Sequence, residues 1–230
     1  MHYKHIFFDL DRTLWDFESN SREALHEIYN DFKLKDRGIS SFEAFLKSYQ
    51  HHNETLWELY RKEIITKEYL RSSRFQLCLA DFDINDRNLA VKMGEKYIQE
   101  SPLKTNLFPY TFEVLHYLSK KYKLHIITNG FEEVQHIKLK YSKLKRFFNH
   151  VITSELVGAK KPNPKIFKLA LEKAGASVQE SLMIGDDFPV DILGAKNIGM
   201  DQVFFNPNKY LTKQKATIQI SCLSELKELL

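Results

Sequence analysis

Short apolar segments that lead into helical patterns are the feature that most restricts how this chain can fold. The apolar segments are His5–Asp9, Leu124–Thr128, His150–Thr153, Leu182–Asp186 and Gln202–Phe205. The helical patterns are Tyr110–Lys121, Glu132–Tyr141, Pro164–Ala174 and Pro189–Asn197. Alternating strands and helices are typical of a parallel sheet, because parallel neighbours require a crossover connection. The sequence therefore predicts a doubly wound α/β core.

One long stretch interrupts this alternation. More than a hundred residues separate the first predicted strand from the second, whereas a crossover connection needs only about a dozen. From about Ser19 to Glu100 the apolar positions recur at helical spacing, which predicts helices alone. We therefore expect a core formed by residues 1–16 and 104–230, with a helical subdomain inserted at residues 17–103.

The formal net charge of +4 raises the question of a nucleic-acid partner. The densest basic stretch contains Lys138, Lys140, Lys143, Lys145 and Arg146. Apolar residues interrupt it at helical spacing, which is the pattern of an amphipathic helix with a solvated basic face. We therefore expect no nucleic-acid partner.

The remaining composition is typical of a cytoplasmic protein without a membrane partner. No apolar run approaches the roughly 20 residues that cross a bilayer, and the N-terminal residues lack the pattern of a secretory leader. The two cysteines, Cys78 and Cys222, lie far apart and form no CxxC pair. Neither a disulfide framework nor a structural zinc site is therefore expected.

Two aspartates, Asp9 and Asp11, stand at the end of the first predicted strand. Residues two apart in an extended strand project to the same side, so both carboxylates are expected together at the carboxyl edge of the sheet, with Arg12 pointing away. Open α/β sheets bind ligands at that edge. Two neighbouring negative charges favour a bound cation or a raised pKa on one carboxylate. A helix cap would explain one aspartate but not two.

With these residues the sequence resembles the haloacid dehalogenase (HAD) superfamily, whose first motif is an apolar strand followed by Asp-x-Asp-x-Thr. Asp9, Asp11 and Thr13 match it. The other motifs of that superfamily follow in order, at Ile126-Ile127-Thr128-Asn129-Gly130, Lys160-Lys161-Pro162 and Met183-Ile184-Gly185-Asp186-Asp187. The resemblance implies a Rossmann-like HAD core and, from the position of the insertion, an α-helical cap of the C1 type.

The resemblance also implies a phosphatase that acts through an aspartyl-phosphate intermediate. Asp9 would attack phosphorus as the nucleophile, and Asp11 would serve as general acid and then general base. Thr128 and the amide of Asn129 would donate hydrogen bonds to the phosphoryl oxygens. Lys161 would neutralise the charge on the phosphate and the nucleophile.

Further residues take supporting roles by the same resemblance. Mg²⁺ would be held by Asp186, Asp9 and the backbone carbonyl of Asp11, an all-oxygen set that suits a hard cation. The lysine directly before proline enters the site in this family, which selects Lys161 over Lys160. The supporting residues implied around these ligands are Thr13, Asp187 and Asp191. Asp191 would orient the lysine or a metal-bound water, although an exposed carboxylate near a helix start explains it equally well.

The residues also distinguish phosphomonoester hydrolysis from several other activities. A halogen-displacing relative typically lacks the second aspartate, so Asp11 favours phosphate chemistry. A receiver-type signalling domain has about half this length and no insertion. A noncatalytic phosphate-binding scaffold would be expected to have lost Asp9 or Asp11. A sugar-phosphate phosphatase or phosphomutase would share every core residue and remains an alternative.

The insertion narrows the resemblance further. Residues 53–70 and the pair Arg74-Phe75 resemble the cap of the pyrimidine 5′-nucleotidase branch, which dephosphorylates noncanonical nucleotides. The expected partner is therefore a small phosphate monoester, namely a nucleoside 5′-monophosphate of pyrimidine type. Trp57 and Tyr60 could stack on a base, but residues three apart on a helix are more often core. The residues considered as substrate contacts are Trp15, Phe17, Asn53, Trp57, Tyr60 and Arg74.

Overall fold

The computed structural model describes residues 3–230, and the chain divides into two compact units. The core unit consists of the chain up to Phe17 together with Thr105–Leu230, and the cap unit is Glu18–Lys104. Each limit lies one residue after the boundary expected from the sequence. No helix among residues 3–230 is long and apolar enough to cross a membrane.

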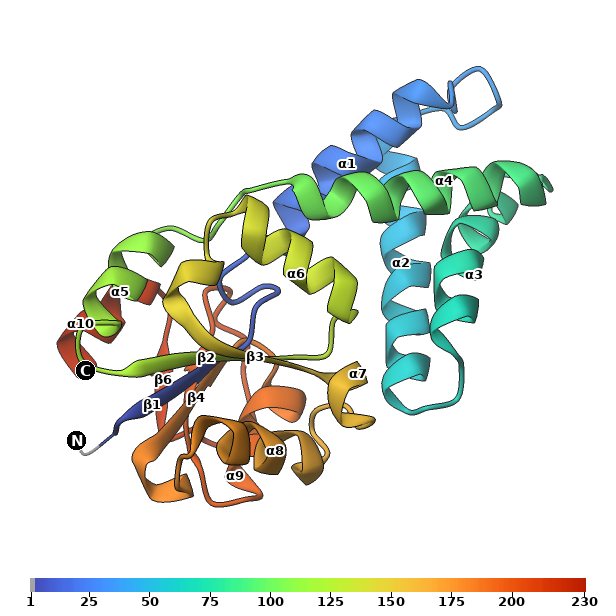
Figure 1. The fold of residues 1–230 in the computed structure, drawn as a ribbon. Helices are drawn as coiled ribbons and strands as arrows, with labels where there is room; N and C mark the ends of the chain where they lie inside the picture. Colours follow the sequence, from blue (N-terminus) through green and yellow to red (C-terminus); the bar gives the residue numbers. More distant parts are fainter. Residues whose placement is uncertain (1–2) are drawn as a thin grey trace. The chain divides into compact units, whose positions relative to one another are not determined.

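The core unit is built on a six-stranded parallel sheet with the order β3-β2-β1-β4-β5-β6 (Figure 1). Its strands are β1 (His5–Phe8), β2 (Lys123–Thr128), β3 (Phe148–Thr153), β4 (Ser181–Gly185), β5 (Asp201–Phe205) and β6 (Ile218–Ile220). The predicted doubly wound α/β fold is confirmed. The sixth strand was missed because a run of three residues carries no periodic signal.

The strand order reverses beside β1, and this reversal positions the site. The chain moves outward from β1 to β3 and then returns to β4 on the other side of β1. Phe8 pairs with Ile184, and the amide of Asp9 donates to the carbonyl of Ile184 at 2.9 Å. The segments that follow β1 and β4 therefore lie side by side at the carboxyl edge, where doubly wound sheets bind ligands.

Helices cover both faces of this sheet (Figure 1). Alternate residues of β1 enter different apolar clusters, because strand side chains alternate between faces. Ile6 and Phe8 pack with helices on one face, and Phe7 packs with helices on the other. The first face carries α5 (Thr111–Leu118), α6 (Glu132–Tyr141) and α10 (Leu226–Leu229). The second carries α8 (Pro164–Ala174) and α9 (Leu193–Lys196), while the short α7 (Ser154–Val157) follows β3.

The segment after β4 is helical, as the pattern at Pro189–Asn197 predicted. The chain is helical from Phe188 to Lys196, but its first five residues, Phe188–Ile192, form a π-helical turn that precedes α9. The side chain of Asp187 accepts a hydrogen bond from the amide of Val190 at 3.1 Å. Single π-helical turns are frequent at functional sites, and this one carries Asp191.

The cap unit contains helices alone. They are α1 (Phe17–Asp31), α2 (Phe42–Arg61), α3 (Lys67–Ala80) and α4 (Arg87–Glu100), of which the first begins at the edge of the core unit. Ser41, Thr66 and Asp86 cap the last three, each accepting a hydrogen bond from an amide three residues on. The unit has an apolar core of its own, which includes Phe45 and Phe75.

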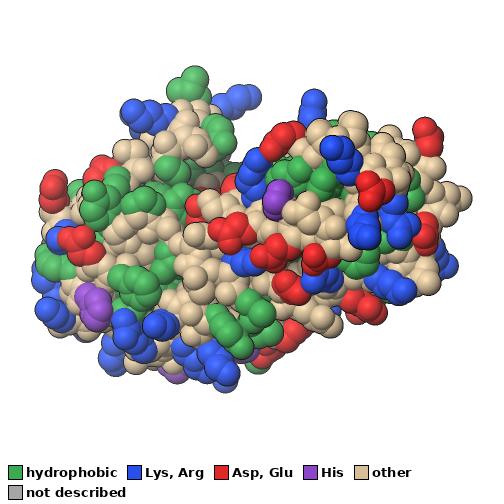
Figure 2. All heavy atoms as spheres, turned by 90° about the horizontal axis from the view of Figure 1, so that it is seen from above, with side chains coloured by type: hydrophobic (Ala, Val, Ile, Leu, Met, Phe, Trp, Pro, Cys, Tyr) green, Lys and Arg blue, Asp and Glu red, His purple; other side chains and the backbone are tan. Residues whose placement is uncertain are grey.

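Charged side chains are mixed on the surface in view in Figure 2. Basic side chains there lie among acidic, hydrophobic and uncharged ones rather than in a continuous basic field. Within the basic stretch, Lys140, Lys143, Lys145 and Arg146 are exposed, as predicted for a solvated face. Lys138 is the exception, because it is buried.

Three histidines stack across the second face of the sheet. The ring of His125 lies parallel to those of His5 and His150, with centroids 5.4 and 5.3 Å away, and also stacks on Phe7. His125 is fully buried, and within residues 3–230 its Nδ1 has no hydrogen-bond partner. Burial, reinforced by the nearby charges of His5, His150 and Lys123, lowers the pKa of His125 to about 3.

Because of His125, the free energy of unfolding is expected to decrease as the pH is lowered. An unfolded histidine takes up a proton near pH 6.5, whereas folded His125 resists it, so acidification from pH 6.5 towards 3 favours the unfolded chain. One such proton contributes a slope of at most about 1.4 kcal/mol per pH unit. Urea unfolding of metal-free protein at pH 7 and 5 should show a smaller loss of stability in His125→Phe than in the wild type. The same loss in both would contradict this, and exposed His51→Phe serves as control.

Candidate active site

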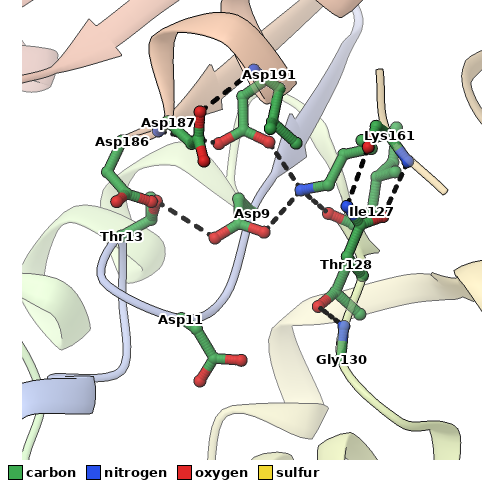
Figure 3. Close-up of polar contacts among 12 residues, drawn as sticks. Asp9, Asp11, Thr13, Ile127, Thr128, Gly130, Lys161, Asp186, Asp187 and Asp191 are labelled. Atoms are coloured by element: carbon green, nitrogen blue, oxygen red, sulfur yellow. Dashed lines mark hydrogen bonds and ion pairs between the residues drawn. The ribbon is translucent and has the colours of Figure 1, made fainter. Parts of the chain in front are cut away.

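A buried lysine joins two carboxylates at the carboxyl edge of the sheet (Figure 3). The Nζ of Lys161 donates to Asp9 Oδ1 and to Asp191 Oδ1, both at 2.6 Å, and to the carbonyl oxygen of Ile127 at 2.8 Å. Only 2% of Lys161 is exposed, so these three acceptors satisfy a charge that water barely reaches. The structure thus places Lys161, rather than Lys160, beside Asp9.

A third carboxylate, from the segment after β4, completes the cluster. Asp9, Asp186 and Asp191 each offer an oxygen within 4.8 Å of the others, and among residues 3–230 no other group of three or more potential ligands is so close. The hydroxyl of Thr13 lies 3.1 Å from Asp186 Oδ1 and 3.4 Å from Asp9 Oδ2. An all-oxygen set of carboxylates is what a hard divalent cation requires.

The pKa values of the cluster also indicate a site that favours a bound cation. Burial raises the pKa of Asp9 to about 7 despite the opposing charge of Lys161. Burial and the charges of Asp9 and Asp191 raise the pKa of Asp186 well above its usual value. Burial alone would lower the pKa of Lys161, but the two carboxylates outweigh it and raise that pKa. Three carboxylates so close together repel one another, which favours a proton on one of them or a further bound cation.

Local backbone features fix the position of Asp191. A side chain at Gly185 would place a Cβ 2.3 Å from Asp191 Oδ2, so the last residue of β4 must be glycine for this carboxylate to fit. The same oxygen, Asp191 Oδ2, accepts a hydrogen bond at 3.1 Å from the amide of Asp187, the residue that caps the π-helical turn. Asp191 is 1% exposed, which excludes the alternative of an exposed carboxylate.

Thr128 and Asn129 follow β2 at the same edge. The Thr128 hydroxyl oxygen accepts hydrogen bonds from the amide of Gly130 at 3.1 Å and from Gln135 Nε2 at 2.6 Å. Its own proton is therefore left to donate to another group. The side chain of Asn129 forms two hydrogen bonds with the backbone of Lys161. It accepts from the amide at 2.7 Å and donates to the carbonyl at 3.0 Å. These contacts of the Asn129 side chain with the backbone of Lys161 were not predicted from the sequence.

Asp11 is not one of the three clustered carboxylates, although it lies near enough for its charge to contribute to the raised pKa of Asp9. β1 ends at Phe8, and Arg12 has a left-handed backbone with φ of 64°, so the chain turns instead of staying extended. Figure 3 shows Asp11 set apart from Asp9, on the side of Thr128 and away from Lys161. The guanidinium of Arg12 lies 4.4 Å from the ring centroid of Phe17.

Two residues of α6 contact Asp11, and neither contact was predicted from the sequence. Lys138 Nζ lies 2.5 Å from Asp11 Oδ1, and Gln135 Nε2 lies 2.8 Å from Asp11 Oδ2. The expectation of a solvated face was therefore wrong for Lys138. A signal was present, because Phe131, Gln135 and Lys138 recur at the spacing of one helix face. Polar residues on an otherwise buried stripe point to a polar partner.

The residues predicted to contact the substrate are divided between the core unit and the cap unit and differ in burial. In the core unit, Trp15 is fully buried and Phe17 packs against the same apolar cluster. In the cap unit, Asn53, Tyr60 and Arg74 are buried and Trp57 is half-buried. Arg74 Nη1 lies 3.5 Å from Asn53 Oδ1, and its guanidinium lies 4.6 Å from the ring centroid of Tyr97. Trp57 and Tyr60 contact each other edge to face, with centroids 5.6 Å apart.

Comparisons with known proteins agree with this geometry. The family model of haloacid dehalogenase-like hydrolases matches residues 3–199. The chain is 32% identical to the pyrimidine 5′-nucleotidase YjjG from Escherichia coli, covering 100% of this chain and 99% of that protein. It is 33% identical to a glyceraldehyde 3-phosphate phosphatase from Pyrococcus furiosus, covering 99% and 92% of the two proteins.

A solved structure shows the same arrangement of elements. The HAD-hydrolase YfnB from Bacillus subtilis, bound to magnesium, superposes with a TM-score of 0.88 at 26% identity, covering 100% of this chain and 99% of that one. The family match spans most of the chain and includes Asp9, Lys161 and Asp186. The chain therefore belongs to the haloacid dehalogenase-like hydrolase family.

Proposed function

We propose that this hydrolase is a phosphomonoesterase that uses Mg²⁺ and a phosphorylated Asp9. The observation that carries the proposal is the contact of the buried Asp9 carboxylate with Lys161, beside Asp186 and Asp191. A buried carboxylate held in one orientation can act as a nucleophile towards phosphorus. The ammonium of Lys161 can offset the negative charge that a phosphate adds to the site.

The charge balance of the cluster supports a divalent cation. The ammonium of Lys161 pairs with Asp9 and Asp191, and the charge of Arg12 acts on Asp186, so negative charges still outnumber positive ones when all three carboxylates are ionised. Asp9, Asp186 and the backbone carbonyl of Asp11 would hold the ion. When bound, Mg²⁺ would neutralise charge on the phosphate and on the nucleophile.

The chain's own residues then account for two successive displacements. In the first, an oxygen of Asp9 bonds to phosphorus while the leaving oxygen departs and takes a proton from Asp11. In the second, Asp11 takes a proton from water as that water attacks phosphorus, and the Asp9 carboxylate is released with inorganic phosphate. Thr128, whose hydroxyl proton is available, and the amide of Asn129 would donate to the phosphoryl oxygens.

The proposed substrate is a nucleoside 5′-monophosphate of pyrimidine type. The relative named pyrimidine 5′-nucleotidase covers this whole chain, cap unit included, and the cap sequence from Asn53 to Leu70 with Arg74 resembles that branch. A second candidate is a sugar phosphate, because the relative named glyceraldehyde 3-phosphate phosphatase is equally similar. Both candidates use the same core residues.

A panel of phosphate monoesters distinguishes these candidates. With Mg²⁺, kcat/KM for phosphate release should be about tenfold or more higher for pyrimidine nucleotides than for glyceraldehyde 3-phosphate or hexose phosphates, the usual scale of discrimination between substrates. Chelation of the metal should abolish release, and added Mg²⁺ should restore it. The reverse ranking would favour the sugar-phosphate candidate. No release from any monoester would reject the proposed function.

A further inference from the structure

The side chain of Asp11 is held by two residues of one helix. Gln135 and Lys138 are three residues apart on α6, so their side chains lie on the same helix face. Gln135 Nε2 donates to one carboxylate oxygen of Asp11 at 2.8 Å, and Lys138 Nζ donates to the other at 2.5 Å. Each oxygen of this carboxylate therefore has its own donor, which fixes the plane of the group as well as its position.

Gln135 also connects Asp11 to the residue expected to bind phosphate. The same Nε2 lies 2.6 Å from the hydroxyl oxygen of Thr128, so its two hydrogens serve Asp11 and Thr128 at once. Gly130 makes room for this amide, because a Cβ there would lie 2.3 Å from Gln135 Nε2. Gln135 is fully buried, and its position is therefore set by packing and not by solvent.

Lys138 is held equally firmly. Only 5% of the residue is exposed, and its ammonium lies 4.2 Å from the ring centroid of the fully buried Trp15. The face of an indole ring attracts a cation and leaves it few alternative positions. A buried ammonium is costly without an anionic partner, and the carboxylate of Asp11 supplies one.

We propose that Gln135 and Lys138 are positioning residues that hold the Asp11 carboxylate across from Asp9, where it serves the leaving oxygen and then the attacking water. This inference rests on the proposed function, because it assigns how Asp11 is placed for that reaction. Neither residue touches the phosphate. They act through Asp11, and Gln135 additionally aligns Asp11 with Thr128.

The geometry explains why Asp11 needs such support. The turn that carries it includes a left-handed residue, Arg12, and leaves the strand before Asp11. Asp11 lies outside β1, in a turn where its backbone forms an isolated bridge with Trp15, and an acid–base group is effective only at hydrogen-bond distance from the atom that it serves. Two donors on a rigid helix supply that support.

The test compares substrates whose leaving groups need a proton to different extents. An alkoxide leaving from a nucleotide requires protonation, whereas p-nitrophenolate leaves without it. Lys138→Met should lower kcat/KM for the nucleotide by about 10²-fold, the lower end of what acid–base catalysis contributes. For p-nitrophenyl phosphate kcat/KM should fall by less than about threefold, because Asp9 and Thr128 are unchanged. Equal losses on both substrates, or no loss on the nucleotide, would overturn the proposal.

Gln135→Met provides a second variant if the first fails to fold. It removes the amide donor while keeping the length of the side chain. Because Gln135 also donates to Thr128, both substrates should lose some rate, but the loss should remain clearly larger on the nucleotide. Lys140→Met is the matched control, because it makes the same change on the same helix at an exposed position. It should leave both rates unchanged.

A double-variant comparison separates this inference from the proposed function. In an Asp11→Asn background, Lys138→Met should cause no further loss on either substrate, since the group that it positions is already absent. A further loss there would show a role independent of Asp11 and would overturn the proposal. An inactive wild type would reject the proposed function itself, whereas an active wild type with equal losses would reject only the positioning role.

Discussion

Asp9→Asn is expected to lower kcat by about 10⁴- to 10⁶-fold, the scale seen when a hydrolase loses its covalent nucleophile. An amide cannot attack phosphorus to form the acyl phosphate, so the remaining residues can bind the substrate but not turn it over. Rates measured with saturating nucleotide and Mg²⁺ give the effect directly. Activity within about tenfold of the wild type would remove Asp9 from its proposed role.

The same variant tests for the intermediate. Wild-type protein mixed with radiolabelled substrate and quenched in acid should retain label as an aspartyl phosphate, whereas Asp9→Asn should retain none. The fold should survive, because asparagine has the size of aspartate and Lys161 keeps its contacts with Asp191 and Ile127. Thermal unfolding should confirm this with a midpoint within a few degrees, where about 1 kcal/mol corresponds to 2–4 °C. Unfolded protein would make the rate uninformative, and Asp9→Glu is then the substitute.

The sequence was sufficient where function depends on residues at strand ends. Asp9 follows a short apolar run that predicts a buried strand, and Asp186 follows another. In a doubly wound sheet the carboxyl ends of such strands meet at one edge, so their convergence could be predicted before any coordinates. Lys161 was predicted by resemblance alone, since no periodic pattern shows where a loop lysine points.

The sequence was insufficient where a side chain's direction depends on a turn or on a neighbouring helix. Strand parity does not fix the direction of the Asp11 side chain, because β1 ends at Phe8 and the chain then enters a turn that contains the left-handed Arg12. The charge of Lys138 suggested solvent, and although its spacing from Phe131 and Gln135 indicated a shared helix face, the identity of its partner, Asp11, is visible only in three dimensions. The π-helical turn at Phe188–Ile192 likewise has no periodic signature, although it determines where Asp191 points.

Lys161→Met is expected to lower kcat/KM by about 10²- to 10³-fold, the range observed when one charge-stabilising donor is removed. The side chain is about as long as lysine, so the change removes the charge and three hydrogen bonds with little change in volume. Lys160→Met is the matched control, because it makes the same change one residue earlier. It should alter kcat/KM by less than about threefold, and equal losses in both variants would contradict the assignment of Lys161.

The same substitution is expected to destabilise the fold by about 3–5 kcal/mol at pH 8, because it leaves Asp9 and Asp191 buried without their shared cation. The loss should shrink as the pH falls. The pKa of Asp9 is about 7 even with Lys161 present, so both carboxyls take up protons more readily once the lysine is gone, and a neutral carboxyl needs no cation. Urea unfolding of metal-free protein at pH 8 and 5.5 measures both losses, and an equal loss at the two pH values would show that Lys161 stabilises the fold by packing and not by charge.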